Sequence, residues 1–202
     1  GSPLIPAFVR AGHQVVATDI DLRDAHPWGA FGPALGHLDV RDRAEVAAAF
    51  QTVDPDLVLH LAAETSLEVC DADPDHGYLT NTIGTKYVAL AARAHGCPMT
   101  YISTAGVFDG TKTGAYTEFD RPNPLNVYGD SKHEGEILVE RLVPQHYVIR
   151  AGWMVGGGAK KDHKFVSRIV DQIRGGATQV FAVTDKLGTP TYAPDFSRCL
   201  LG

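Results

Sequence analysis

The run LVLHL (Leu57–Leu61) is a short apolar segment of the kind that forms buried strands in parallel sheets. A long helical pattern follows it over Pro74–His95 and ends at Gly96, a residue type that commonly stops helices. A second strand pattern comes next, at Met99–Ser103. A strand, a helix and a strand at this spacing predict a right-handed β–α–β unit with parallel strands.

The same alternation extends toward both ends of the chain. Further helices are expected at Pro3–Ala11, Arg41–Gln51, Asn126–Leu142 and Asp162–Arg174, and further strands at Gln14–Asp19 and Tyr147–Arg150. The pattern predicts an α/β fold with a doubly wound parallel sheet of the Rossmann type. Because the first helix begins at once, we expect the first strand of such a sheet, and most of its glycine-rich turn, to be missing from this sequence.

Composition excludes several classes of partner. The chain has 202 residues, with 18 Lys and Arg against 24 Asp and Glu, a formal net charge of −6. Nucleic acids and anionic membranes select clustered positive charge, so neither is expected as a partner. No apolar run approaches the length of a membrane span, and no signal peptide is recognisable. Cys70, Cys97 and Cys199 show no metal or redox spacing, which predicts free thiols, no metal site and a cytoplasmic location.

Tyr128 and Lys132 form a Tyr-x-x-x-Lys pair in the string YGDSK. At positions i and i+4 of a helix, both side chains lie on one face. An ammonium group near a phenol favours the phenolate and lowers a pKa that is normally about 10. Tyr128 is therefore expected to exchange a proton with a carbonyl or an alcohol near neutral pH.

A hydroxyl pair, Ser103-Thr104, comes at the carboxyl end of the strand expected at Met99–Ser103. Ligands of open α/β sheets bind at that edge, and a hydroxyl there can hydrogen-bond a carbonyl oxygen on which charge develops. An ordinary Ser/Thr turn is the alternative. The Tyr128 pair that follows in the chain favours a catalytic role for Thr104.

Asp19 ends the strand expected at Gln14–Asp19. If Gly1 is the last glycine of a dinucleotide fingerprint, Asp19 lies where an acid hydrogen-bonds the adenosine ribose. A carboxylate there repels a 2′-phosphate, which favours NAD(H), whereas Arg23 keeps NADP(H) open. A helix cap or a solvated turn is the alternative role for Asp19.

Four other residues have candidate roles near a cofactor. Asp39 and Val40 follow another expected strand and could hold the adenine, although Asp39 could instead cap the next helix. Ala62 and Ala63 follow the LVLHL strand, and their small side chains allow a cofactor to approach the backbone, as they also would at an ordinary strand end. His60, inside LVLHL, is expected to be a packed core histidine rather than a base.

Several strings of this sequence, taken in order, resemble the extended short-chain dehydrogenase/reductase family. The most specific are YISTAGVFDG (Tyr101–Gly110) and PLNVYGDSKHEGE (Pro124–Glu136). Others are NTIGT (Asn81–Thr85), RAGWMVGGG (Arg150–Gly158) and GTPTYAPD (Gly188–Asp195). The resemblance covers essentially the whole chain and is strongest to the reductases of sugar nucleotides.

The resemblance implies a role for each matching residue. Thr104, Tyr128 and Lys132 match the catalytic triad, with Tyr128 as the proton donor, Lys132 as its pKa partner and a ligand of the cofactor ribose, and Thr104 as the hydroxyl that orients the carbonyl. The other matches are cofactor-lining Ala62, Ala63, Glu64, Thr65 and Ile102, and substrate-lining Ala105 and Trp153. Residues 1–155 would form the dinucleotide-binding domain, and residues 156–202 the start of a sugar-nucleotide subdomain, most of which we expect to be absent.

The resemblance also implies a reaction. Hydride would pass from a nicotinamide to the C4 ketone of a nucleotide-linked 4-keto-6-deoxysugar, and Tyr128 would protonate the oxygen. The acid that such reductases often carry beside the threonine is replaced here by Ala105, which weakens the substrate assignment and argues against a dehydratase. An NAD-dependent sugar-nucleotide epimerase and a non-catalytic regulatory subunit of the same fold are the alternatives. The helix face Gly77–Ala92 could support a homodimer.

Overall fold

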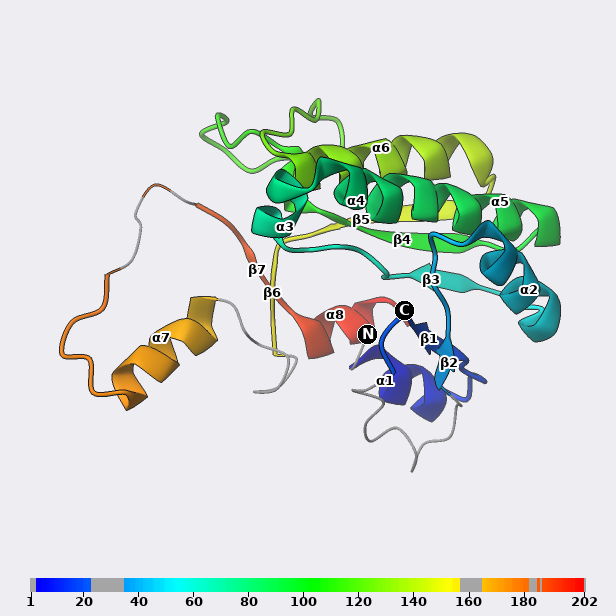
Figure 1. The fold of residues 1–202 in the computed structure, drawn as a ribbon, viewed down its shortest axis with the longest axis horizontal. Coiled ribbons are helices and arrows are strands. Elements are labelled where there is room, and N and C mark those ends of the chain that lie inside the picture. The colour runs from blue at the N-terminus through cyan, green and yellow to red at the C-terminus, as the bar shows by residue number, and fades with distance from the viewer. Residues whose placement is uncertain (1–2, 23–34, 157–164, 182–184, 186, 202) are drawn as a thin grey trace. The chain divides into compact units, whose positions relative to one another are not determined.

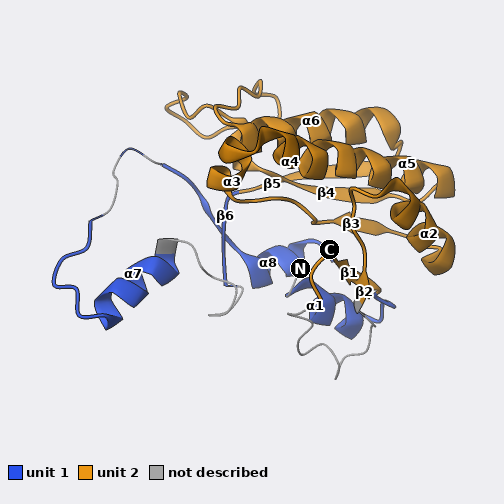
Figure 2. Ribbon diagram, viewed as in Figure 1, with its two compact units in different colours: residues 1–15, 152–202 blue, residues 16–151 orange. Residues whose placement is uncertain are grey.

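The computed structural model describes residues 3–22, 35–156, 165–181, 185 and 187–201. The chain divides into two compact units, one of residues 16–151 and one of residues 1–15 with 152–202 (Figure 2). The sequence predicts a division at residue 155 between a part that binds a dinucleotide and a part that binds a sugar nucleotide. The two units observed here are defined by packing, which does not show what either part binds, so the division by binding role stays a prediction.

The larger unit is built on a parallel sheet of three strands in the order β3-β4-β5 (Figure 1). These strands are β3 (Val58–His60), β4 (Met99–Thr104) and β5 (His146–Ala151). In their register, His60 pairs with Tyr101 and Thr104 pairs with Ala151. The parallel pairing confirms the predicted α/β class, and β4 brings Thr104 to the carboxyl edge of the sheet.

Two strands are shorter than the sequence predicts. The run expected over Gln14–Asp19 forms a strand only at β1 (Ala17–Asp19), which pairs in parallel with β2 (Leu35–His37). The LVLHL run contributes three residues to β3, and Leu57 before them is 43% exposed. Because β3 is an end strand of its sheet among the described residues, the predicted strand is present but only partly buried.

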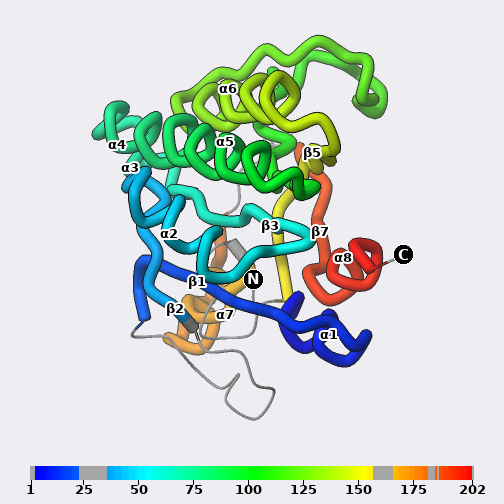
Figure 3. Tube along the Cα trace, turned by 90° about the vertical axis from the view of Figure 1, so that its right-hand side faces the viewer, coloured from blue at the N-terminus to red at the C-terminus, as the bar shows by residue number. Residues whose placement is uncertain are grey.

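Helices α4, α5 and α6 lie side by side on one side of this sheet (Figures 1 and 3). The helices of the larger unit are α2 (Arg43–Val53), α3 (Leu67–Ala72), α4 (Pro74–Tyr78), α5 (Thr85–His95) and α6 (Val127–Leu142). A 3₁₀ turn, η3 (Ala105–Val107), follows β4. Asp42 caps α2 by accepting hydrogen bonds from the backbone N–H groups of Ala44 and Glu45, as the sequence predicts for this position.

The long helix expected over Pro74–His95 is continuous but not uniform. Its middle, η2 (Leu79–Gly84), is π-helical and separates α4 from α5. Within this segment the Asn81 carbonyl accepts a hydrogen bond from the Thr85 hydroxyl at 2.6 Å. Gly96 ends α5 with a φ of 69°, so the predicted stop is confirmed.

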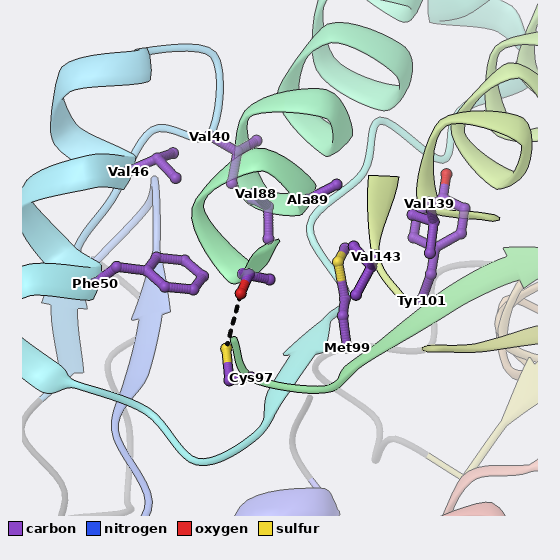
Figure 4. Packing of buried hydrophobic residues seen from close by; sticks show 11 residues of the cluster. Val40, Val46, Phe50, Val88, Ala89, Cys97, Met99, Tyr101, Val139 and Val143 are labelled. Carbon is purple, nitrogen blue, oxygen red and sulfur yellow. Dashed lines mark hydrogen bonds between the residues drawn. The ribbon is translucent and has the colours of Figure 1, made fainter. Parts of the chain in front are cut away.

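A cluster of buried side chains fills the space between α2, α5, α6 and the sheet (Figure 4). Its members include Val46 and Phe50 of α2, Val88, Ala89 and Ala92 of α5, Met99 and Tyr101 of β4, and Val139 and Val143 of α6 and its end. The Cys97 thiol donates to the Ala92 carbonyl at 3.7 Å. This packing holds β4 against α6 and so limits how far the two elements can move relative to each other.

The smaller unit contains both ends of the described chain. Its elements are α1 (Leu4–Arg10), β6 (Trp153–Val155), α7 (Phe165–Arg174), β7 (Pro190–Tyr192) and α8 (Ala193–Cys199). Strand β6 pairs in parallel with β7, and α1 contacts α8. The expected helix at Pro3–Ala11 is confirmed as α1, and the one expected to start at Asp162 is seen from Phe165, since Asp162 lies outside the described residues. None of the described helices is both long and apolar enough to cross a bilayer.

Candidate active site

Thr104 is the last residue of β4 and caps η3. Its Oγ1 accepts a hydrogen bond from the backbone N–H of Gly106 at 3.0 Å. Because that bond uses a lone pair, the hydroxyl hydrogen of Thr104 can still be donated to another oxygen. Thr104 therefore lies at the edge of the sheet in the state that a carbonyl-orienting hydroxyl requires.

The first turn of α6 is packed against η3 without room for a side chain at Gly129. A Cβ atom there would lie less than 3.0 Å from the carbonyl oxygen of Gly106. Asn126 caps α6 by accepting a hydrogen bond from the N–H of Gly129 at 2.8 Å. These contacts fix the start of α6, which places the Tyr128 phenol near the Thr104 hydroxyl.

Burial raises the pKa of the Tyr128 phenol, and the nearby Thr104 side chain partly opposes this rise. The Tyr-x-x-x-Lys spacing predicts a lowered pKa for Tyr128 instead, because the Lys132 ammonium would favour the phenolate. That expectation is wrong for this structure because burial has the larger effect. Tyr128 is therefore protonated at neutral pH and has a proton to donate.

Lys132 lies one turn further along α6 and is only 2% exposed. Its Nζ lies 4.1 Å from the centroid of the Tyr101 ring. Burial lowers the pKa of Lys132 to about 7, and the nearby Glu136 carboxylate opposes this effect. Because this pKa is close to neutral, small changes around Lys132 alter the fraction that is charged.

A buried ion pair lies one turn beyond Lys132. Glu136 is 1% exposed and accepts two hydrogen bonds from Arg150 of β5, from Nε at 2.9 Å and from Nη2 at 2.7 Å. Nδ1 of His133 lies 3.2 Å from the same carboxylate. Burial acts to raise the pKa of Glu136, but the hydrogen bonds outweigh it and hold this pKa below its usual value. The pair ties α6 to β5 and keeps a negative charge near Lys132.

Asn81 connects the loop after β3 to α6. Its side-chain oxygen accepts from the N–H of Glu64 at 2.9 Å, and its Nδ2 donates to the Glu64 carbonyl and to Oγ of Ser131, both at 3.0 Å. Thr82 adds a hydrogen bond from its hydroxyl to the Ser131 carbonyl at 2.8 Å. The loop and the first turns of α6 are therefore held together through the π-helical segment.

This loop contains four of the residues that the resemblance assigns to the cofactor: Ala62, Ala63, Glu64 and Thr65. Ala62 and Thr65 are exposed, and the Glu64 carboxylate accepts from the N–H of Ser66 at 2.8 Å. Ile102 is half-buried on β4. A role for these residues in cofactor binding stays a prediction.

The three other described cofactor candidates differ in what their side chains do. Asp19 is exposed at the end of β1, where its carboxylate accepts from the N–H of Asp21 at 3.1 Å. Asp39 binds Arg41 through Nε at 2.9 Å and Nη2 at 2.6 Å, and Asp42 rather than Asp39 caps α2. Val40 belongs to the core cluster. Of the three, Asp19 presents a carboxylate to solvent in the way that a ribose ligand requires.

Gly1 and Arg23 lie outside the described residues. Ala105 is exposed at the start of η3 in the larger unit. Trp153, on β6 in the smaller unit, is 53% exposed, and a Cβ atom at Gly188 would lie less than 3.0 Å from its ring. In the described part of the chain, no three His, Cys, Asp or Glu side chains are grouped so as to hold a metal ion.

His60 is a packed core residue, as the sequence predicts. Its Nε2 lies 3.0 Å from the Thr85 hydroxyl, and its ring stacks on that of Tyr101 with centroids 5.6 Å apart. The Thr85 hydroxyl gives its hydrogen to the Asn81 carbonyl, so Nε2 must be the donor to Thr85. Burial lowers the pKa of His60 to about 3, and the ring is neutral.

Sequence reasoning assigned no role to Tyr101, Asn81, Glu136 or Arg150. All four lie within the sequence strings that resemble the family, and this resemblance is the sequence feature that could have indicated a functional role. Their contacts with Lys132, with the loop after β3 and with each other join residues far apart in the chain, so only the fold brings them together.

A parallel α/β sheet with a hydroxyl and a phenol at one strand end, and a buried lysine one helical turn away, defines the extended short-chain dehydrogenase/reductase class. The match to a family model is more specific. Residues 1–202 match the model described as RmlD substrate binding domain, and the chain belongs to that family.

Relatives of this chain carry one recurring name. The dTDP-4-dehydrorhamnose reductase of Sinorhizobium fredii is 34% identical over 165 residues, which cover 82% of this chain and 54% of the relative. The crystal structure of the Yersinia enterocolitica dTDP-4-dehydrorhamnose reductase is 33% identical, with a TM-score of 0.78 over 100% of this chain and 67% of that one. The Bacillus anthracis protein of the same name, solved in complex with NADP, is 29% identical, with a TM-score of 0.75 over 84% of this chain and 61% of that one. The chain spans about half the length of the curated relatives it matches.

Because His60 is buried in its neutral form, the free energy of unfolding should decrease at acid pH. Its pKa is about 3 in the folded protein against 6.5 for the free group, so the unfolded state binds the extra proton between these values. Stability should therefore fall as the pH falls from about 6.5 toward 3. His60→Gln keeps a donor for Thr85 but cannot titrate. The stability difference between wild type and variant, from urea unfolding at several pH values, should change by up to about 1.4 kcal/mol per pH unit in this window. A difference that is constant with pH would contradict the assignment.

Proposed function

We propose that this chain forms the catalytic part of a dTDP-4-dehydrorhamnose reductase, which reduces the C4 ketone of a nucleotide-linked 4-keto-6-deoxysugar with NAD(P)H. The observation that carries the proposal is the grouping of three side chains, with Thr104 at the end of β4, Tyr128 near it on α6 and buried Lys132 one turn further along α6. The relatives named for this activity support the substrate class.

The residues present fit a nicotinamide dinucleotide. The loop after β3 offers small residues, with Ala62 exposed, and Asp19 presents a carboxylate that would bind the adenosine ribose. Nζ of Lys132 lies over the face of the Tyr101 ring, and its N–H groups would donate hydrogen bonds to the hydroxyls of the second ribose. When bound, the cofactor would supply the hydride.

Each residue of the triad has one task in this proposal. The Thr104 hydroxyl donates to the ketone oxygen and stabilises the negative charge that develops there. The Tyr128 phenol transfers its proton to that oxygen as the alcohol forms. The charged Lys132 ammonium stabilises the phenolate that remains on Tyr128. The hydride would come from the cofactor, the proton comes from Tyr128, and Tyr128 must regain a proton from solvent before the next turnover.

The relatives named as reductases favour that activity over an epimerase, the second candidate. In reduction the tyrosine gives up a proton, whereas in an epimerase it first accepts one. Stoichiometry separates the two, because a reductase consumes one NAD(P)H per turnover and an epimerase recycles its bound NAD. A regulatory subunit of the same fold, the third candidate, would bind a nucleotide without turnover. The cytoplasmic location, the homodimer and the division at residue 155 are parts of the proposal that rest on the sequence alone.

The proton-donor role predicts the effect of Tyr128→Phe. In the full-length protein, NADPH oxidation on addition of dTDP-4-dehydrorhamnose should fall by at least about 100-fold, since general acid catalysis contributes this much or more. The Kd for NADPH should change by no more than a few-fold. Tyr147→Phe is the matched control, because Tyr147 is 68% exposed on β5. Turnover in Tyr128→Phe equal to that of Tyr147→Phe would rule out the role.

The ribose-binding role predicts a change of cofactor preference for Asp19→Ala. Without the carboxylate, repulsion of the 2′-phosphate is removed, so the ratio of kcat/KM for NADPH to that for NADH should rise by about 10-fold, the effect of roughly 1.4 kcal/mol. Both values are measured from the rate of cofactor oxidation at saturating sugar substrate. An unchanged ratio would mean that Asp19 has only a structural role.

A further inference from the structure

Tyr101 contacts Lys132 at both ends of the lysine. The face of the Tyr101 ring lies 4.1 Å from Nζ of Lys132, and the Tyr101 hydroxyl donates to the main-chain carbonyl of Lys132 at 3.3 Å. Tyr101 is fully buried on β4, and Lys132 is nearly so on α6. One tyrosine therefore sets both the position of the lysine backbone and the surroundings of its ammonium group.

The Tyr101 ring is itself held in place by its neighbours. His60 stacks on it with an interplanar angle of 23°, and His60 is fixed by its hydrogen bond to Thr85. On the side of α6, the Tyr101 hydroxyl lies so close to Gly135 that a Cβ atom there would approach it to less than 3.0 Å. Tyr101 therefore contacts both His60 and Lys132 in the buried interior of this unit.

A buried ammonium group needs compensation for the water that it loses. The nearest carboxylate on the same helix, Glu136, is already bound by two hydrogen bonds from Arg150 and faces His133. The electron-rich face of an aromatic ring attracts a cation, and most strongly where water is excluded. At this site Tyr101 supplies that ring face.

We propose that Tyr101 is a positioning residue for Lys132, and that its ring face keeps the lysine charged and aimed at the site before ligands bind. The inference rests on the proposed function and deepens it, because the charged lysine is the form that stabilises the Tyr128 phenolate. The Lys132 pKa of about 7 makes the contribution of the ring decisive at neutral pH.

Of the titratable groups on the neighbouring elements, Glu136 favours the charged form of Lys132. Glu136 is itself paired with His133 on α6 and with Arg150 on β5, and Tyr128 lies one turn before Lys132 on α6. On β3, His60 is neutral and adds no charge. A test of Tyr101 must therefore change the electron density of its ring while leaving its size and these neighbours unchanged.

The experiment replaces Tyr101 by Phe and then by phenylalanines that carry one, two and three ring fluorines. Each fluorine weakens the attraction of the ring face for a cation while nearly preserving its volume. The pKa of Lys132 is read from the ¹³Cε resonance of labelled lysine in the full-length protein without ligand, and the signal that disappears in Lys132→Arg gives the assignment. The proposal predicts that this pKa falls step by step along the series, by a total of about one pH unit. An equal pKa in all four rings would overturn it.

A second readout separates this inference from the proposed function. The alkaline limb of the pH profile of kcat for NADPH oxidation should move to lower pH in the same order, while the acid limb stays in place. If the protein did not oxidise NADPH with any 4-keto-6-deoxysugar nucleotide, the proposed function would fail, but the titration of Lys132 would still decide the role of Tyr101.

Discussion

The site depends on how closely α6 approaches β4 and the turn that follows it. At Gly129 the helix lies against the Gly106 carbonyl, and at Gly135 it lies against the Tyr101 hydroxyl, so neither position has room for a Cβ atom. α6 carries Tyr128 directly before the first of these contacts and Lys132 between the two. The close approach therefore sets the phenol beside Thr104 and the ammonium over the Tyr101 ring. A wider spacing would separate both pairs, whatever residues occupied the motif.

Burial that follows from this spacing sets the chemistry of the side chains. It raises the pKa of Tyr128, which keeps the phenol protonated, and lowers the pKa of Lys132 to about 7, against the effect of the Glu136 carboxylate. Both effects come from exclusion of water rather than from a direct bond between the two residues. Carbonyl reduction needs a proton donor and a nearby lysine that can carry a charge, and Tyr128 and Lys132 match these two needs.

Much of this could be predicted from the sequence, because the features concerned are local. The strand and helix pattern around LVLHL, the Asp42 cap, the Gly96 stop and the packed state of His60 depend on neighbours in the chain and are confirmed. The direction of the Tyr128 pKa shift was predicted wrongly, since the i, i+4 spacing shows that Lys132 is on the same face but not how deeply both residues are buried. The roles of Asn81 and of the Glu136–Arg150 pair could not be predicted either, because these contacts exist only after α6 has packed on the sheet.

The central claim, that the approach of α6 to the end of β4 creates the site, is tested most directly by kcat in Gly129→Ala. A Cβ atom at this position must push α6 away from Gly106, whereas Gly114→Ala adds the same methyl group where nothing lies within 4 Å. The account predicts that kcat for NADPH oxidation falls by about 100-fold in Gly129→Ala, the effect of a displacement of about 1 Å, and stays at the wild-type value in Gly114→Ala. A wild-type kcat in Gly129→Ala would contradict the claim, because the helix would then be free to move without loss of the reaction.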